Sequence, residues 1–170
     1  MKPLALVLAG CLAALVACGG TNDAASDTTI GELADCNDTC QNLGIEPGVG
    51  VHLGGGSVRI GAPAADAEAV LGAPDRVLEL SSQGRRRLQW PDLAVTTDAA
   101  GAVEVVEVLQ TFPGTTVDGL GLGSDRAAVE ATSPGVREPF LGALVDRSAG
   151  IAWVFENDVV VRAVVFAPTP

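Results

Sequence analysis

Short runs of branched apolar residues alternate with turn-forming residues through the second half of the chain. Leu93–Thr97 and Val103–Leu109 flank a turn at 98–101, and Ile151–Glu156 and Val159–Phe166 flank a second turn. Runs of Val, Ile and Phe bounded by Gly, Asn and Asp predict strands joined as antiparallel hairpins. One further strand is expected before each pair, over residues 86–90 and 141–145.

Each group of strands follows an alanine-rich stretch that predicts a short helix. Pro63 suits the first helical position, and Gly72 with Pro74 ends the first helix. Ser124 is placed to cap the second helix, which stops before Pro134. Because both helices are short and composed mostly of alanine, we expect them to need packing against another element.

The order of one helix and three strands therefore occurs twice. From it we predict an α+β fold of two tandem modules, each a short helix packed on a three-stranded antiparallel sheet. The first module covers residues 51–110, a connection covers 111–121, and the second module covers 122–170.

The same residues resemble the BamE (SmpA/OmlA) lipoprotein module. The resemblance rests on Ile60-Gly61 before the first helix, Leu71-Gly72-Ala73-Pro74 after it, and then Leu88-Gln89-Trp90, Leu93-Ala94-Val95 and Gly101-Ala102-Val103. The second copy departs from this pattern at Thr132-Ser133-Pro134. The duplicated arrangement is similar to that of β-lactamase inhibitor protein. The resemblance implies a protein that works by binding other proteins, in envelope assembly or enzyme inhibition.

Residues 1–17 are predicted to be a bacterial lipoprotein signal peptide. Lys2 precedes an apolar run over residues 3–17. At about 1.5 Å per residue this run covers about 22 Å, less than the bilayer core of roughly 30 Å. It ends in Leu15-Val16-Ala17-Cys18, which resembles the lipobox, whose cysteine thiol receives a diacylglyceryl group. Cys18 is the predicted lipidation site, because cleavage before Cys11 would leave too short an apolar core. The alternative is an ordinary secretory signal.

Cys36 and Cys40 are the two cysteines left after processing and lipidation. An even pair in an exported chain predicts a local disulfide, since one helical turn brings such residues to about 6 Å. A metal site with Asp35, Asp38 or His52 is the alternative. It lacks a second Cys or His pair, so we predict no metal.

The charge of the chain is strongly acidic and unevenly distributed. Acidic residues outnumber basic ones by 21 to 10, for a net charge of −11. This balance argues against nucleic acid as a partner, since proteins that bind it carry a basic face. Residues 18–50 hold six acids and no basic residue, and we predict that they form a lipidated acidic tether with a local Cys pair.

No catalytic residue and no cofactor are predicted, and the chain is not expected to be an enzyme. His52 is the only histidine, and the chain has no Gly-x-Ser-x-Gly or Ser-x-x-Lys motif that would pair a nucleophile with a base. Residues 54–57, Gly-Gly-Gly-Ser, have backbone N–H groups that could donate hydrogen bonds to an anion. A flexible turn is the simpler interpretation of this segment.

The candidate binding surface consists of Arg85, Arg86, Arg87, Trp90, Trp153 and Phe155. In a strand, Arg85 and Arg87 lie on one face and Arg86 on the other. The arginine run predicts either a solvated edge or a contact for an acidic partner or a phosphate-bearing polymer. Trp153 and Phe155 share one strand face, which is either core against the helices or an exposed interface.

Together these features predict a lipid-anchored bacterial envelope protein that acts as a non-enzymatic protein-binding module. Its predicted partners are the membrane, through the lipid anchor, and an envelope protein. The alternative is a structural accessory that binds a cell-wall or lipid ligand through the arginine run and residues 54–57. Gly19 favours the outer membrane, because in enterobacteria an Asp after the lipidated cysteine favours retention in the inner membrane.

Overall fold

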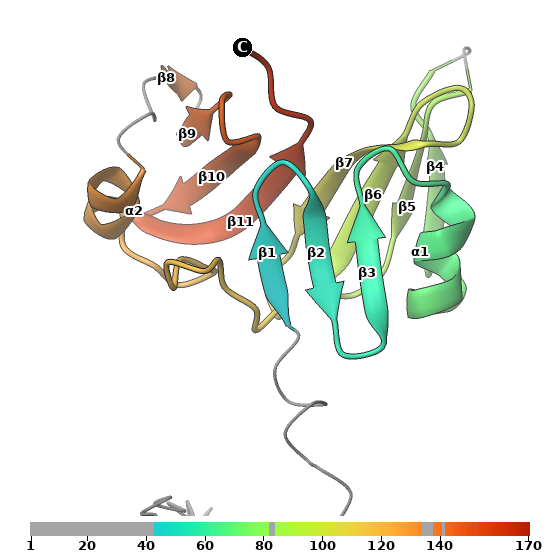
Figure 1. Cartoon of the computed structure of the whole chain (residues 1–170), viewed down its shortest axis with the longest axis horizontal. Helices are drawn as coiled ribbons and strands as arrows, with labels where there is room; N and C mark the ends of the chain where they lie inside the picture. Colours follow the sequence, from blue (N-terminus) through green and yellow to red (C-terminus); the bar gives the residue numbers. More distant parts are fainter. Residues whose placement is uncertain (1–42, 82–83, 134–137, 141) are drawn as a thin grey trace, which may run out of the picture. The chain divides into compact units, whose positions relative to one another are not determined.

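Eight strands form one antiparallel sheet in the part of the chain that the structure describes. The computed structural model describes residues 43–81, 84–133, 138–140 and 142–170. Across the sheet the strand order is β4-β5-β6-β7-β11-β10-β9-β8 (Figure 1). The strands are β4 (Arg76–Glu79), β5 (Arg86–Gln89), β6 (Leu93–Thr97), β7 (Val103–Val108), β8 (Glu138–Phe140), β9 (Ala143–Asp146), β10 (Ile151–Glu156) and β11 (Val159–Phe166).

A second, three-stranded sheet precedes the first helix, with strands β1 (Gly44–Glu46), β2 (Gly50–Leu53) and β3 (Gly56–Arg59). Its buried side chains are Ile45, Val51 and Val58, which all enter the main hydrophobic core. Gly50 has a φ of +148°, and a Cβ at this position would lie 2.0 Å from the Val58 carbonyl oxygen. Glycine is therefore required where β2 and β3 approach each other.

Helix α1 (Ala64–Leu71) begins and ends close to the predicted residues. Pro63, predicted as the first helical residue, is instead the N-cap, so the helix begins one residue later, and Gly72 is the C-cap. The Trp90 indole Nε1–H donates a hydrogen bond of 3.0 Å to the Gly72 carbonyl oxygen. This bond satisfies a carbonyl at the helix end, and it joins the end of α1 to Trp90, the residue that directly follows β5.

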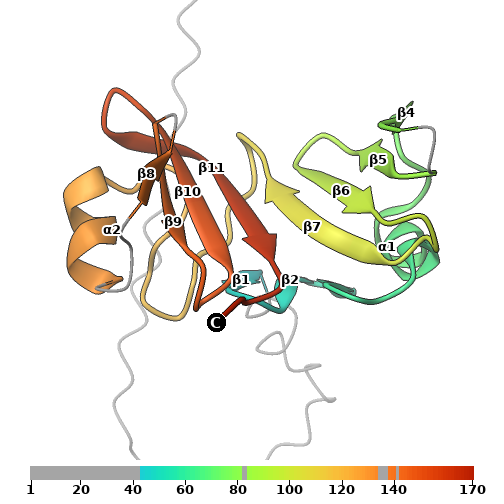
Figure 2. The ribbon, with the colours of Figure 1, turned by 90° about the horizontal axis from the view of Figure 1, so that it is seen from above.

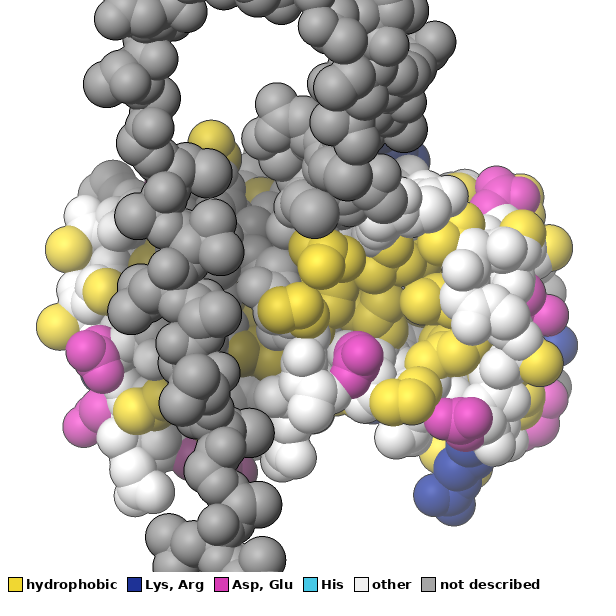
Figure 3. Space-filling view, turned by 90° about the horizontal axis from the view of Figure 1, so that it is seen from below, with side chains coloured by type: hydrophobic (Ala, Val, Ile, Leu, Met, Phe, Trp, Pro, Cys, Tyr) yellow, Lys and Arg dark blue, Asp and Glu magenta, His cyan; other side chains and the backbone are white. Residues whose placement is uncertain are grey.

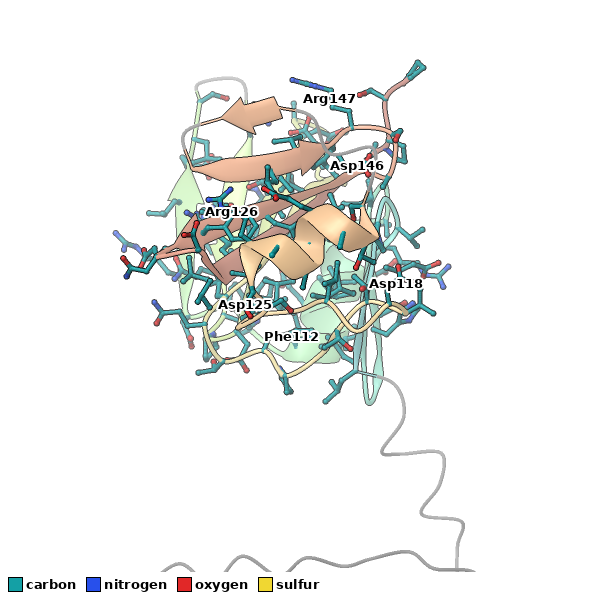
Figure 4. The ribbon with its side chains drawn as sticks, turned by 90° about the vertical axis from the view of Figure 1, so that its left-hand side faces the viewer. Phe112, Asp118, Asp125, Arg126, Asp146 and Arg147 are labelled. Carbon is teal, nitrogen blue, oxygen red and sulfur yellow. The ribbon has the colours of Figure 1, made fainter. Side chains whose placement is uncertain are left out.

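Helix α2 (Arg126–Thr132) has Asp125 as its N-cap, and the Ser124 hydroxyl instead accepts a hydrogen bond from the preceding loop. Its first residue, Arg126, is labelled in Figure 4. This side chain contacts the β10–β11 hairpin in two ways. The guanidinium donates to Asp158 Oδ1 at 2.7 Å and lies 4.2 Å from the centroid of the Phe155 ring. The first turn of this short helix is thereby fixed to the sheet.

The two faces of the eight-stranded sheet have different surroundings. On one face, Leu88, Val95, Val106 and Val165 lie opposite one another across β5, β6, β7 and β11 and are all buried. They belong to one core cluster that includes Ile45, Val51 and Val58 of the small sheet, Ala67 of α1 and Val129 of α2. We call the face that carries these residues the covered face. Figure 2 shows β1 and β2 on one side of the large sheet.

The opposite face, which we call the open face, is defined by Arg87, Ala94, Thr96, Glu107, Arg162 and Val164 and by the residues that pair with them across the strands. Among the described residues, none from the open face belongs to the core cluster. The sheet therefore presents one face to the helices and the small sheet and leaves the other without a second layer.

The predicted fold of two separate helix-on-three-strand modules is wrong. Each helix is followed by four strands, because β4 and β8 join the edges of the sheet. Strand β7 pairs directly with β11, Val106 opposite Val165 and Val108 opposite Ala163, so the two sets of strands form one continuous sheet. The strand order is symmetric about this central pair. The described residues are mostly β, with two short helices and one shared core.

Candidate protein-binding face

The aromatic residues of the predicted binding surface lie in the core. Trp153 is 1% exposed, Trp90 4% and Phe155 8%. Trp153 lies opposite Ala163 on β11 and Leu144 on β9, and Ala163 in turn lies opposite Val108 on β7. All four residues are on the covered face. The sequence left open whether Trp153 and Phe155 lie in the core or at an exposed interface. In the structure they lie in the core, so these side chains offer no surface to a partner.

The three consecutive arginines have three different environments. Arg85 Nε donates to Glu104 Oε2 at 2.9 Å, and both side chains are substantially exposed. Arg86, at the start of β5, lies opposite Thr97 on the covered face and is exposed. Arg87 lies on the open face and binds Glu107. Two of the three arginines therefore already bind carboxylates of the chain itself, Glu104 and Glu107.

Glu107 of β7 is at the centre of an ion-pair cluster on the open face. It binds Arg87 through both carboxylate oxygens, with Arg87 Nη2 at 2.9 Å from Glu107 Oε2. Arg162 Nη1 lies 3.3 Å from the same Oε2. The Glu107 side chain is only 11% exposed, whereas those of Arg87 and Arg162 are 23% and 44% exposed. Two guanidinium groups thus share one carboxylate, and the cluster has a net charge of +1.

The sequence of β6 explains how Arg87 reaches a strand that is not its neighbour. Arg87 lies opposite Thr96, and Glu107 lies opposite Ala94, both on β6. These are the small open-face residues of β6, so the long arginine side chain extends across the strand to β7. A bidentate guanidinium–carboxylate pair fixes both side chains in one geometry. The cluster therefore spans β5, β7 and β11, at the middle of the sheet.

Apolar side chains surround this cluster. Val105, Val154, Val164 and Phe166 point to the open face, and each is only partly buried. Beside Arg162 lies a cavity of about 340 Å³, whose polar lining residues are Gln89, Gln110, Glu156 and Arg162. Arginine is enriched in protein–protein interfaces and among the residues that contribute most to binding, so guanidinium groups beside half-buried apolar side chains form a candidate contact surface.

Among the described residues, the remaining candidates, His52 and the glycine turn at 54–57, lie on the small sheet. His52 Nε2 lies 2.7 Å from Glu46 Oε2, and both side chains are exposed on the small sheet. Gly54 and Gly55 form the turn of the β2–β3 hairpin. Within residues 43–170, leaving out the undescribed gaps, no group of three potential metal-ligating side chains occurs. Cys18, Cys36 and Cys40 lie outside the described residues.

Sequence reasoning missed Glu107 and Arg162 as members of the site. A signal was present in each case, because Glu107 interrupts a valine run on β7 and Arg162 interrupts another on β11. A charged residue in the middle of a strand that lies centrally in a sheet needs a partner on the same face. Finding that partner requires the β7–β11 register, which no local pattern specifies.

Comparison with known proteins does not assign the chain to a family. Among the described residues, neither helix has the length and apolar character that crossing a bilayer requires. No protein-family model, curated protein or solved structure matches this chain.

Proposed function

We propose that this chain is a lipid-anchored bacterial envelope protein that binds another protein, without catalysis, through the open face of its sheet. The observation that supports this function is the Arg87–Glu107–Arg162 cluster, whose central carboxylate is only 11% exposed although it lies on a face with no second layer. A structural role alone would not require a salt bridge in this position, since apolar residues of similar volume often stabilise as well or better.

The charge of the cluster indicates the character of the partner. The chain carries a net charge of −11, but the cluster contributes two cations and one anion. A partner that places a carboxylate near Arg162 would complete a balanced set of two cations and two anions. The surrounding valines and Phe166 would supply apolar contact area around that centre.

The anchor is supported by the amino-terminal sequence alone. Replacement of Cys18 by serine is expected to move the protein from the detergent phase to the aqueous phase in a Triton X-114 partition, because acyl chains provide the membrane affinity. The Cys11→Ser variant is the matched control and should remain in the detergent phase. A Cys18→Ser protein that stays with the detergent would contradict the lipidation site.

The binding face is tested by photo-crosslinking in intact cells. A benzophenone side chain at Val164, on the open face, is expected to give one discrete adduct. The same group at Val77, which is 50% exposed and points to the covered side of the edge strand, should give none. Arg162→Gln should reduce the adduct roughly fivefold or more, since an interface arginine commonly contributes over about 1 kcal/mol.

Arg59→Gln is the control for this loss of charge. Arg59 is exposed on the small sheet, and among the described residues its side chain donates a hydrogen bond to the nearby Ser57 hydroxyl. It should leave the adduct unchanged. Equal adducts from Val164 and Val77, or an equal loss in the two arginine variants, would contradict the open face as the interface.

A further inference from the structure

An apolar groove of about 340 Å³ lies at the end of the fold where β1 begins, on the side opposite the turn from β1 to β2. Its walls come from segments far apart in the sequence and include Leu43, Leu53, Leu71, Trp90 and Phe112. Asp92 is the one charged residue that lines it. Figure 3 shows this side of the molecule, where hydrophobic side chains gather into a continuous patch.

Two polar side chains at the walls of the groove have hydrogen-bond partners within the chain. The Trp90 indole N–H donates to the Gly72 carbonyl oxygen, and the Asp92 carboxylate accepts a hydrogen bond from the Thr111 hydroxyl. A ligand in this groove therefore gains little from hydrogen-bonding groups of its own. The chemistry fits a flexible hydrocarbon chain, whose burial contributes about 0.8 kcal/mol for each CH₂.

The position of the groove beside Leu43, the first described residue, indicates its occupant. Leu43, the first described residue, is 47% exposed and itself lines the groove. The predicted lipidation site, Cys18, lies 25 residues before it (43 − 18). At about 3.3–3.6 Å per extended residue this segment spans up to roughly 85 Å, so a lipid on Cys18 has ample reach back to the groove.

From these observations we infer that the groove receives an acyl chain carried by Cys18 of the same molecule. This inference rests on the proposed lipid anchor. A single acyl chain gives only marginal membrane binding, whereas several together anchor a protein stably. Withdrawal of one chain into the groove would therefore weaken the attachment, and exchange of that chain between groove and bilayer would adjust how long the protein stays on the membrane.

Trp90 reports directly on occupancy. The chain has two tryptophans, so in a Trp153→Phe background all indole fluorescence comes from Trp90, at the groove wall. The full chain is compared with and without Cys18→Ser in the presence of the same phosphatidylcholine vesicles and a nitroxide-labelled palmitate. We expect the label to quench Trp90 in Cys18→Ser, and the lipidated protein to need roughly tenfold more label for half-quenching.

Three results would overturn the inference. Absence of quenching in Cys18→Ser would show that the groove does not take acyl chains. Equal quenching of both proteins would exclude the Cys18 lipid as its occupant. The third measurement is the intact mass of the protein purified from membranes, which distinguishes these failures from failure of the lipid anchor. An unmodified mass would contradict lipidation of Cys18, and an acyl chain on Cys18 could then not be the occupant, whatever the quenching shows.

A pair of matched leucine variants tests the location. Leu43 lines the groove at 47% exposure, and Leu80, 50% exposed, follows the edge strand β4 away from it. In the Cys18→Ser background, Leu43→Gln should require at least threefold more label for half-quenching, while Leu80→Gln should leave the titration unchanged, since about 0.7 kcal/mol corresponds to that ratio. An equal loss in both variants would overturn the groove as the site.

Discussion

Replacing Trp153 with alanine is expected to lower the free energy of unfolding by about 3–5 kcal/mol. The side chain is 1% exposed and is the largest among the fully buried ones in the described residues. It lies on the covered face of β10, aligned with Ala163 on one side and Leu144 on the other, so truncation to alanine leaves a cavity in the core. Urea denaturation followed by circular dichroism measures the change.

Trp153→Phe is the control that separates packing from specific polar contacts. Among the described residues the Trp153 indole Nε1–H has no hydrogen-bond partner, so phenylalanine removes a polar atom along with part of the ring. We expect a loss of less than about 1.5 kcal/mol, because the swap keeps most of the buried volume. An alanine variant as stable as the wild type would contradict the core position of Trp153. An exposed position at an interface would then be the better explanation.

Local sequence patterns located most of the central strands. The predicted bounds of β6, β10 and β11 are those of the structure, and β5 and β7 differ by one residue at the end. These segments combine branched apolar residues with clear turns. In the β10–β11 hairpin, Asn157 and Asp158 both have positive φ values, 52° and 63°, as residues of a tight type I′ turn do.

The elements that were missed have weak local signals. Strands β1, β2 and β3 are three or four residues long and contain Gly44, Gly50 and Gly56, and glycine disfavours strands on propensity alone. Strand β1 also lies within the segment assigned to the tether. Glycine is needed at Gly50 because a Cβ there would lie 2.0 Å from the Val58 carbonyl oxygen. Such close backbone approach depends on tertiary structure, so the local sequence does not predict it.

The single sheet could not be predicted because it depends on one long-range pairing. Nothing in the local sequence of β7 or β11 specifies that Val106 lies opposite Val165, nearly sixty positions later. The same limit applies to the candidate site. Alternation correctly separated Arg87 from Arg86, but the partner of Arg87 is two strands away and follows only from the register of β5, β6 and β7.

Glu107→Gln is expected to lower the free energy of unfolding by about 2–3 kcal/mol. The substitution keeps the shape of the side chain but leaves Arg87 and Arg162 facing each other without a carboxylate. Removal of one member of a fully buried pair costs about 3–5 kcal/mol, and the partial exposure of Arg87 reduces that figure. Urea denaturation of the full chain at neutral pH gives the value.

The exposed pair Arg85–Glu104 provides the matched comparison, because it joins the same two residue types from the same two strand regions. Glu104→Gln should cost less than about 1 kcal/mol, since both side chains are well solvated. In about 1 M salt, where the screening length is about 3 Å, the Glu104 effect should vanish while most of the Glu107 effect remains. Equal costs for the two variants, or equal sensitivity to salt, would mean that the Glu107 cluster is solvated like any surface pair. The argument for a desolvated charge on the open face, and with it the main support for an interface there, would then be lost.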